Sequence, residues 1–333
     1  MQILTDLARE GWFADAFALQ VWAQSTFHGI ARRVAGESVA AQPAQACLTM
    51  ERNFFSTFFL AVTRQAVGPT RYMPLYAMVN QAMRAWVTAC DNILDDEYKE
   101  IFPFTFAGSG QRMRSVLTLL IADRVVTEYV LDAFDEAGLL GRVGRVSLAA
   151  LMSSAIQESQ EELRPVPILP PERILGDIHQ RKTGDLFLAP LAMPDALEPL
   201  AGPTRQAAQA ALCQFGLACQ VLDDAKDMPA DLQAGRHNLL VSLLAAAPGR
   251  ANLGPEDLRA EPSSEWTAWD RFPETFEEAW HLAAERFADS FDALAALGIA
   301  LSPAQRDGVV RLMARLLGIP ARAGAPAAPG DFG

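Results

Sequence analysis

Hydrophobic and polar positions follow one another along this chain with the period of an α-helix. Apolar residues return every three or four positions through long segments, and the two-residue alternation of a half-buried strand is nearly absent. Stretches that contain Gly or Pro interrupt the pattern and mark loops. The pattern predicts helices over residues 5–35, 43–67, 73–99, 111–137, 143–164, 171–193, 203–228, 236–247, 274–296 and 303–318.

The interruptions are typical of loops between helices, and none has the length or composition of a clear interdomain linker. No internal repeat is evident. We therefore expect a single all-α domain over 1–320. The remaining stretch, 321–333, is rich in Ala, Pro and Gly, which predicts a disordered tail.

Composition limits the classes of function. Half of the 333 residues are hydrophobic and 20% are charged, as in a globular protein, and the net charge of -12 argues against a nucleic-acid partner. No apolar run reaches the ~18 residues of a membrane span, and the N-terminus lacks a signal-peptide core. The four cysteines have no CxxC spacing. We expect a cytoplasmic protein with reduced cysteines and no membrane span.

Negative charge is concentrated at the end of one predicted helix. The segment CDNILDDEYKE (90–100) places five acidic side chains directly after an apolar stretch, and Asp91 and Asp95 lie one helical turn apart. A solvated helix end would explain this cluster by itself.

A second cluster repeats the arrangement. Another apolar helix ends in Asp223, Asp224, Asp227 and Asp231, of which 223, 227 and 231 share a face if the helix continues past Pro229. Stacked carboxylates repel one another, and Mg²⁺, which prefers carboxylate, water and phosphate oxygens, would relieve the repulsion. The stretch HQRKTGDLFLAP (179–190), with its adjacent Arg and Lys, lies between the two clusters and suits anionic oxygens. Two clusters with a basic element between them favour a metal site over two solvated helix ends.

The order of these motifs resembles the trans-isoprenyl diphosphate synthase family of the class I terpenoid synthase fold. Gln220-x-x-Asp223-Asp224-x-x-Asp227 matches the second aspartate-rich motif of that family, and Lys182-Thr183-Gly184 matches its Lys-Thr motif. QESQEEL (157–163) lies where the family has a Gln-rich helix. DNILD (91–95) is similar to the first DDxxD motif, with Asn92 in the second place. The resemblance covers about 50–245.

This resemblance implies a helical bundle around a deep apolar pocket, with the two acidic clusters facing each other across its mouth. Three Mg²⁺ ions would bind the diphosphate of a prenyl substrate there. The implied metal ligands are Asp91, Asp95, Asp96, Asp223, Asp224, Asp227 and Asp231, with Asp91, Asp95, Asp223 and Asp227 as the catalytic residues. The implied diphosphate-binding residues are Arg181, Lys182, Thr183, Gln220, Lys226 and Arg236. Candidates for the pocket lining, each equally explained as a core residue, are Phe54, Phe55, Phe58, Phe59, Trp86 and Phe215.

Two departures from the family pattern bear on the reaction. The Gly-Gly-Lys-x-x-Arg-Pro motif that binds isopentenyl diphosphate is missing from 50–62, where only Arg52 remains, and Arg112 and Arg114 lie too far beyond the first motif to match its arginine pair. We therefore expect a terpene synthase that ionises farnesyl or geranylgeranyl diphosphate, after which the cation cyclises, eliminates or is quenched. The spacing of Asp223, Asp227 and Asp231 also parallels the metal triad of terpene cyclases.

Three alternatives stay open. The first is a chain-elongating prenyl transferase. The second is a head-to-head synthase of the squalene or phytoene type, suggested by DxxxDD at 91–96. The third is a silent modulatory subunit, although such a subunit has no need of clustered carboxylates. A homodimer is compatible with each of them.

Overall fold

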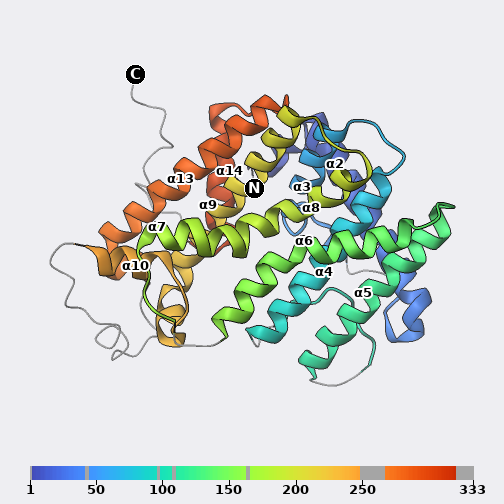
Figure 1. Ribbon diagram of the computed structural model, residues 1–333, viewed down its shortest axis with the longest axis horizontal. Coiled ribbons are helices and arrows are strands. Elements are labelled where there is room, and N and C mark those ends of the chain that lie inside the picture. The colour runs from blue at the N-terminus through green and yellow to red at the C-terminus, as the bar shows by residue number, and fades with distance from the viewer. Residues whose placement is uncertain are drawn as a thin grey trace. The chain divides into compact units, whose positions relative to one another are not determined.

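The computed structural model describes residues 2–41, 45–95, 98–106, 110–162, 166–247 and 267–319. Helices make up nearly all of these ranges, which contain no β-strand and one isolated bridge, between Val39 and Phe104 (Figure 1). The prediction of an all-α fold is confirmed. The predicted tail, 321–333, lies outside the described residues, as does the predicted metal ligand Asp96.

The helices follow one another in a simple order. The first part of the chain forms α1 (Gln2–Leu7), α2 (Gly11–Ala35), η1 (Gly36–Ser38), η2 (Gln45–Leu48), α3 (Phe54–Val67), α4 (Met73–Leu94), α5 (Gln111–Ala133) and α6 (Leu139–Glu161). The second part forms α7 (Pro171–Arg173), η3 (Ile174–Gly184), α8 (Asp185–Leu197), α9 (Gly202–Ala234), α10 (Leu239–Ala246), α12 (Ala268–Arg271), α13 (Pro273–Ala296) and α14 (Pro303–Leu316).

The chain divides into two compact units. Unit 1 comprises Met1–Ile3, Ala149–Ala189 and Gly202–Gly333, and unit 2 comprises Leu4–Leu148 and Pro190–Ala201. The helices α6 and α8 each contribute to both units. The single domain over 1–320 therefore stays a prediction, and each unit is described below by itself.

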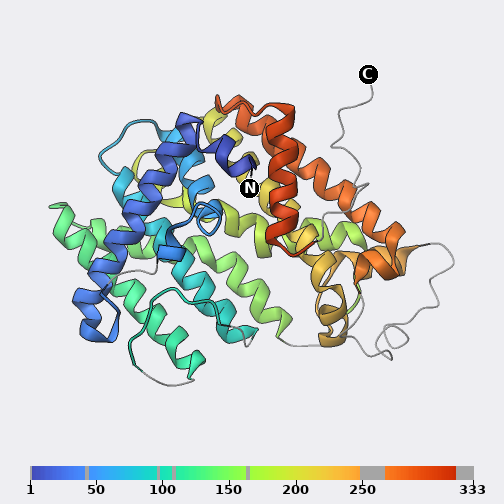
Figure 2. The same ribbon diagram turned by 180° about the vertical axis from the view of Figure 1, so that it is seen from behind.

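The core of unit 2 forms around α2, the long blue helix in Figure 2, which packs against α3, α4 and α5. The ring of Phe13 lies 5.9 Å from that of Phe54, and Phe27 stacks on Phe102 at 5.7 Å. Phe54 and Phe58, two of the candidates for a pocket lining, are buried among other aromatic rings. Here they serve as core residues.

The core of unit 1 is the contact between α9 and α13, which lie side by side. Phe215 of α9 meets Phe287 of α13 edge to face, with ring centroids 5.1 Å apart, so this third lining candidate is also a core residue. Gly216 is required next to it, because a Cβ at this position would lie 2.6 Å from the ring of Phe187. The close approach lets α8 pack against α9 at this point.

Several predicted helix boundaries were wrong for local reasons. The helix predicted over 43–67 begins only at Phe54, because the buried side chain of Asn53 donates hydrogen bonds to the carbonyls of Cys47 and Thr49 and so competes with helix formation. The helix predicted over 5–35 is two helices, divided where Glu10 adopts an extended conformation before Gly11.

Two differences concern the segments with candidate chemistry. The helix predicted over 171–193 contains an 11-residue π-helix, η3, which holds Lys182 and Thr183. Conversely, α9 continues through Pro229 to Ala234, beyond the predicted end at 228, so Asp231 remains on the same helix as Asp223 and Asp227.

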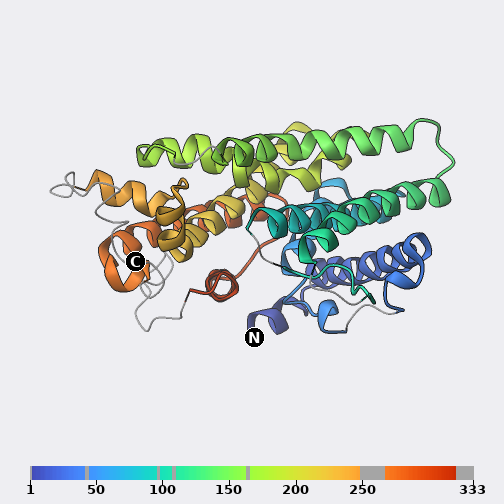
Figure 3. The ribbon, with the colours of Figure 1, turned by 90° about the horizontal axis from the view of Figure 1, so that it is seen from below.

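Helix α6 is one unbroken green helix in Figure 3. Its length and composition would allow it to cross a membrane, and 17% of its most apolar 18-residue window is buried. A single helix of this kind is weak evidence for a membrane span. The end of α6 also carries two glutamates, Glu158 and Glu161, that pair with Lys182.

Candidate active site

The acidic end of α9 holds three carboxylates that repel one another. Burial, followed by the charges of Asp227 and Asp224, raises the pKa of Asp223 to about 6. Burial, followed by the charge of Asp224, raises the pKa of Asp231 to about 7. Asp227, 39% exposed, lies 3.3 Å from the ammonium of Lys226. The cluster therefore contains negative charge that its own cations only partly neutralise.

Asp224 has a different environment, although it belongs to the same motif. Its side chain is 3% exposed, and Oδ1 accepts a hydrogen bond from Gln220 Nε2 at 2.8 Å. Oδ2 accepts from the backbone N–H of Leu239 at 2.6 Å and lies 3.0 Å from Nε2 of His179. Gln220 also accepts a hydrogen bond from the Thr183 hydroxyl. Gln220 and Thr183, predicted to bind diphosphate, are thus engaged with each other.

Lys182 is the central cation of unit 1. Its ammonium lies 3.0 Å from Oε1 of Glu158 and 3.9 Å from Oε2 of Glu161, and both glutamates belong to α6. Burial lowers the pKa of Lys182, but the two glutamates outweigh it and hold the pKa above its ordinary value. The structure therefore keeps Lys182 charged and adds α6 to the site, where the sequence had indicated only a Gln-rich helix.

The remaining cations predicted to bind diphosphate lie around this centre. Arg181 is exposed on η3, and Lys226 is exposed on α9. The backbone N–H of Arg236 donates to the carbonyl of Asp231 at 2.9 Å, which places Arg236 just after the acidic helix. Next to it, burial lowers the pKa of His237. Neither His237 nor His179 was predicted, because an isolated histidine carries no signal in a sequence.

The first acidic cluster lies in unit 2, at the end of α4. Asp91 and Asp95 are exposed, whereas Asn92 between them is buried. The amide of Asn92 accepts a hydrogen bond from the backbone N–H of Lys99 at 2.8 Å and donates to its carbonyl at 3.0 Å. An aspartate in this place could accept the first bond but not donate the second. The altered motif therefore has a structural reason.

Unit 2 also brings two arginines together near the start of α3. Nη1 of Arg84 donates to Oδ1 of Asn53 at 2.6 Å, and Nη1 of Arg52 lies 3.7 Å from Sγ of Cys47. Burial lowers the pKa of Arg84. The charge of Cys47 acts in the opposite direction, and the like charge of Arg52 lowers the pKa further. In the described part of the chain, no carboxylate forms an ion pair with either guanidinium. The two groups are suited to bind an external anion.

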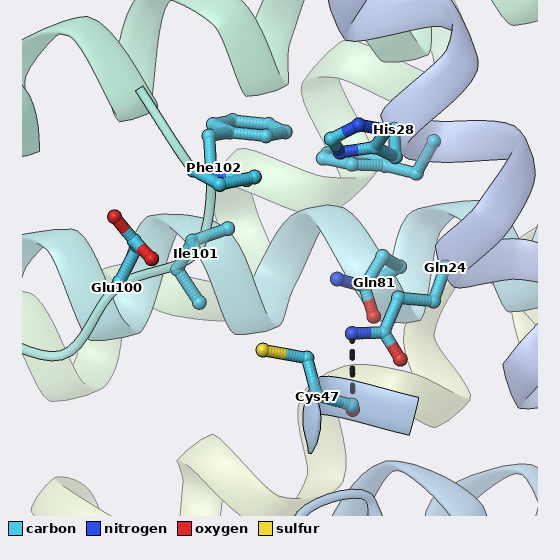
Figure 4. Close-up of a pocket in the computed structure, with 9 residues that line it drawn as sticks. Gln24, His28, Cys47, Gln81, Glu100, Ile101 and Phe102 are labelled. Atoms are coloured by element: carbon cyan, nitrogen blue, oxygen red, sulfur yellow. Dashed lines mark hydrogen bonds between the residues drawn. The ribbon is translucent and has the colours of Figure 1, made fainter. Parts of the chain in front are cut away.

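Unit 2 contains a small pocket, which neither arginine lines (Figure 4). Cys47, which contacts Arg52, lines it, and so does Gln81, one turn before Arg84 on α4. The dashed line in the figure is the hydrogen bond from Gln24 to the Cys47 carbonyl, 3.3 Å long. The other walls come from α2 and from the loop after α4, with Phe27, His28, Glu100, Ile101 and Phe102.

The donors available for a metal ion are carboxylates. Within the described ranges, no group of three or more His, Cys, Asp or Glu side chains is arranged to hold an ion. Asp223, Asp227 and Asp231 nevertheless have the ligand chemistry that Mg²⁺ prefers, because their side chains offer only oxygen atoms. A bound cation would also relieve the repulsion that helps to raise the pKa values of Asp223 and Asp231. Whether Asp91 and Asp95 share one cavity with Asp223, as predicted, stays a prediction.

No protein-family model matches the sequence, and no curated protein sequence matches it significantly. Solved structures do match the fold. A geranylgeranyl pyrophosphate synthase from Lactobacillus brevis is 14% identical, with 91% of this chain and 95% of that chain covered and a TM-score of 0.59. A decaprenyl diphosphate synthase from Rhodobacter capsulatus is 14% identical, covering 94% and 98%, with a TM-score of 0.58. A polyprenyl synthase from Caulobacter crescentus, complexed with calcium and isoprenyl diphosphate, is 17% identical, covering 98% of each chain, with a TM-score of 0.56. The chain therefore has the all-α fold of the isoprenyl diphosphate synthases, as its motifs predicted.

Proposed function

We propose that this protein is a Mg²⁺-dependent prenyl transferase, which joins an allylic prenyl diphosphate to a second substrate that also carries a diphosphate. The sequence alone favoured a terpene synthase without such a second substrate. The observation that changes this preference is the pair Arg52 and Arg84, two guanidiniums that have no carboxylate partner in the described residues. The similar structures named above also include chain-elongating synthases, such as a decaprenyl diphosphate synthase.

The residues of unit 1 suit the ionisation step. Asp223 and Asp227, with Asp231 one turn further, would hold Mg²⁺, which when bound stabilises a departing pyrophosphate. Lys182 supplies a fixed positive charge for the oxygens of the departing pyrophosphate. Charge that develops during a reaction is best stabilised by groups that are already in place. In unit 2 we propose Asp91 and Asp95 as further metal ligands, and this assignment rests on the motif.

The two arginines of unit 2 suit the acceptor. An acceptor diphosphate needs cations that are not already neutralised, and Arg84 meets this condition, because its hydrogen-bond partner among the described residues is the amide of Asn53. The allylic C–O bond breaks and pyrophosphate takes the electron pair, after which the acceptor's double bond attacks the cation and a proton is lost. Isopentenyl diphosphate has the required diphosphate and double bond.

A terpene synthase remains the second candidate. The observation that favours it is Arg114, which lies beyond the first motif and does not take the place of the missing arginine pair. Its Nη2 instead donates to the carbonyl of Phe106 at 2.9 Å, and its guanidinium lies over the ring of Phe106. Arg114 therefore serves the loop after α4. No feature of the described residues favours the head-to-head synthase or the silent subunit.

Kinetics of Arg84→Met test the choice. Removal of a charged hydrogen-bond donor is expected to raise the KM for isopentenyl diphosphate about 10- to 100-fold and to leave the KM for the allylic substrate nearly unchanged. Arg33→Met is the matched control, because Arg33 forms an exposed ion pair with Asp132 in the same unit. An unchanged KM for isopentenyl diphosphate in Arg84→Met would contradict the proposed acceptor site.

We also propose that the protein is a homodimer. The side chains of Met113, Leu120 and Leu131 on α5 are each more than half exposed, at 61%, 64% and 61%. Exposed apolar side chains repeated along one helix are typical of an interaction surface. Light scattering after size exclusion should give twice the monomer mass of 36.2 kDa, and a monomer at micromolar concentration would contradict this proposal.

A further inference from the structure

His179, which no motif assigns, and Asp224, which the second motif assigns to metal, hold η3 to α9. We infer that His179 and Asp224 are positioning residues of the diphosphate site, and that Asp224 supplies no ligand to the metal ions. This inference rests on the proposed function, and it revises the expectation that every aspartate of the second motif binds metal.

The Asp224 carboxylate is already occupied by hydrogen-bond donors of the protein. It accepts hydrogen bonds from Gln220 Nε2, from the Leu239 N–H and from His179 Nε2, at 2.8, 2.6 and 3.0 Å. A carboxylate has about four acceptor positions, so at most one remains. At 3% exposure, water cannot accompany an ion to it, and Mg²⁺ gives up its waters reluctantly.

Asp223 is the contrasting neighbour. Its carboxylate accepts no hydrogen bond from the described residues, and it is less buried than Asp224. Asp227 is 39% exposed and lies 3.3 Å from the ammonium of Lys226. Two adjacent aspartates in one motif therefore have opposite surroundings: Asp223 is available to a cation and Asp224 is not.

The contacts of Asp224 also belong to a closed ring between two helices. His179 and Thr183 are one turn apart on η3, and they contact Asp224 and Gln220, which are one turn apart on α9. The hydrogen bond from Gln220 to Asp224 closes the ring. Because a carboxylate only accepts, Nε2 of His179 must carry the hydrogen, and among the described residues Nδ1 has no hydrogen-bond partner. The ring therefore has three donors, which are His179 Nε2, Gln220 Nε2 and the Thr183 hydroxyl.

The ring fixes the groups that would touch substrate. Lys182 lies between His179 and Thr183 in sequence, and its carbonyl accepts a hydrogen bond from Ser154 of α6 at 2.8 Å. Its backbone is therefore held by the ring and by α6. Longer π-helical stretches are uncommon and often occur at functional sites, and η3 needs such side-chain support.

Asp224 also sets the start of α10. Its backbone carbonyl accepts a hydrogen bond from Asn238 Nδ2 at 2.8 Å, and the same amide lies 3.0 Å from Oδ2 of Asp231. Asn238 in turn caps α10 by accepting from the N–H groups of Leu240 and Val241. A metal ion on Asp224 would have to displace contacts that hold three helices.

Thermal melts of five variants test the inference. Asp224→Asn and His179→Leu each break the ring, so each should lower the Tm of the ligand-free protein by roughly 5 °C or more, as expected for a broken buried pair. His179→Gln keeps a donor and should recover most of that loss. Asp223→Asn, the same substitution one residue away, should not lower the Tm. The double variant of His179→Leu and Asp224→Asn should lose little more than either single variant.

The second measurement adds Mg²⁺ with inorganic diphosphate. The Tm increase produced by the two ligands should persist in Asp224→Asn and disappear in Asp223→Asn. In turnover, His179→Leu should raise the KM for the allylic diphosphate more than it lowers kcat, and the Mg²⁺ concentration for half-maximal rate should stay unchanged. A loss of stability alone would not produce this split.

The outcomes separate the two claims. If Asp224→Asn keeps the ligand-free Tm but loses the increase from Mg²⁺ and diphosphate, Asp224 is a metal ligand and the inference is wrong. If Asp224→Asn does not fold, His179→Leu with an intact increase supports the inference, and a lost increase overturns it. If the wild-type protein shows no increase at all, the proposed function fails, while the coupling between positions 179 and 224 still decides the existence of the ring.

Discussion

Replacing Asp223 by Asn should stabilise the ligand-free protein at neutral pH. The ionised carboxylate is disfavoured in the folded state by burial, by Asp227 and by Asp224, which together raise its pKa from 3.8 to about 6. At 1.36 kcal/mol per pKa unit, this shift sets an upper limit of roughly 3 kcal/mol. Solvent at the edge of the site reduces the effect, so we expect about 1–3 kcal/mol. For a chain of this size, that corresponds to a Tm increase of about 2–6 °C.

The pH dependence of stability is a second test of whether the ionised Asp223 carboxylate destabilises the folded protein. A carboxyl group with a raised folded pKa keeps its proton where the unfolded chain has lost it, so its contribution to stability grows as the pH falls from 7 towards 4. Conversely, that contribution is lost as the pH rises through about 6. The advantage of Asp223→Asn over the wild type should therefore be largest at pH 8 and should shrink towards pH 5.

The assay is a series of thermal melts of both proteins from pH 5 to pH 8, without divalent cations and then with Mg²⁺ and diphosphate. Under the second condition the order should reverse, because the wild type gains a ligand for the metal and the variant does not. A variant that is less stable than the wild type at pH 8 would refute the reasoning, since it would show that the Asp223 carboxylate is favourably paired in the folded protein.

Three further substitutions have defined outcomes. Glu158→Gln removes one ion-pair partner of Lys182 and should strengthen the binding of Mg²⁺-diphosphate about two- to fivefold in calorimetry, as expected for a partly exposed ion pair. Weaker binding would instead place Glu158 among the ligands. Asn92→Asp restores the motif but loses the donor to the Lys99 carbonyl. It should therefore lower the free energy of unfolding, measured by chemical denaturation, by about 1–3 kcal/mol and should not increase turnover. Asp227→Ala should reduce kcat at least about 100-fold with an unchanged Tm, and near-normal kcat would reduce Asp227 to a helix-end charge.

The helices of this fold could be predicted from the sequence because their apolar positions repeat over many turns. The stretches 274–296 and 303–318 agree with α13 and α14 to within two residues. Two of the misplaced helix boundaries depend on the side-chain amide of a single residue. Asn53 delays the start of α3, and Asn92 contacts the segment just after α4. The periodicity of hydrophobic positions cannot predict a contact made by one polar side chain.

The candidate site could be predicted only as far as its motifs. The residues Asp223, Lys182 and Gln220 are recognisable by their spacing, whereas His179, Glu158 and Arg84 become candidates only through distances and burial. Arg84 is the instructive case. It lies inside an apolar helix with no motif, and only the fold shows that it lies beside Arg52 without a carboxylate partner in the described residues.

The most direct test of the proposed transferase is mass spectrometry of the products formed from farnesyl diphosphate in the presence of Mg²⁺, with and without isopentenyl diphosphate. We predict a longer prenyl diphosphate when both substrates are present and little release of pyrophosphate from farnesyl diphosphate alone. A hydrocarbon or alcohol formed from farnesyl diphosphate alone, unaffected by isopentenyl diphosphate, would contradict the transferase and establish the terpene synthase in its place.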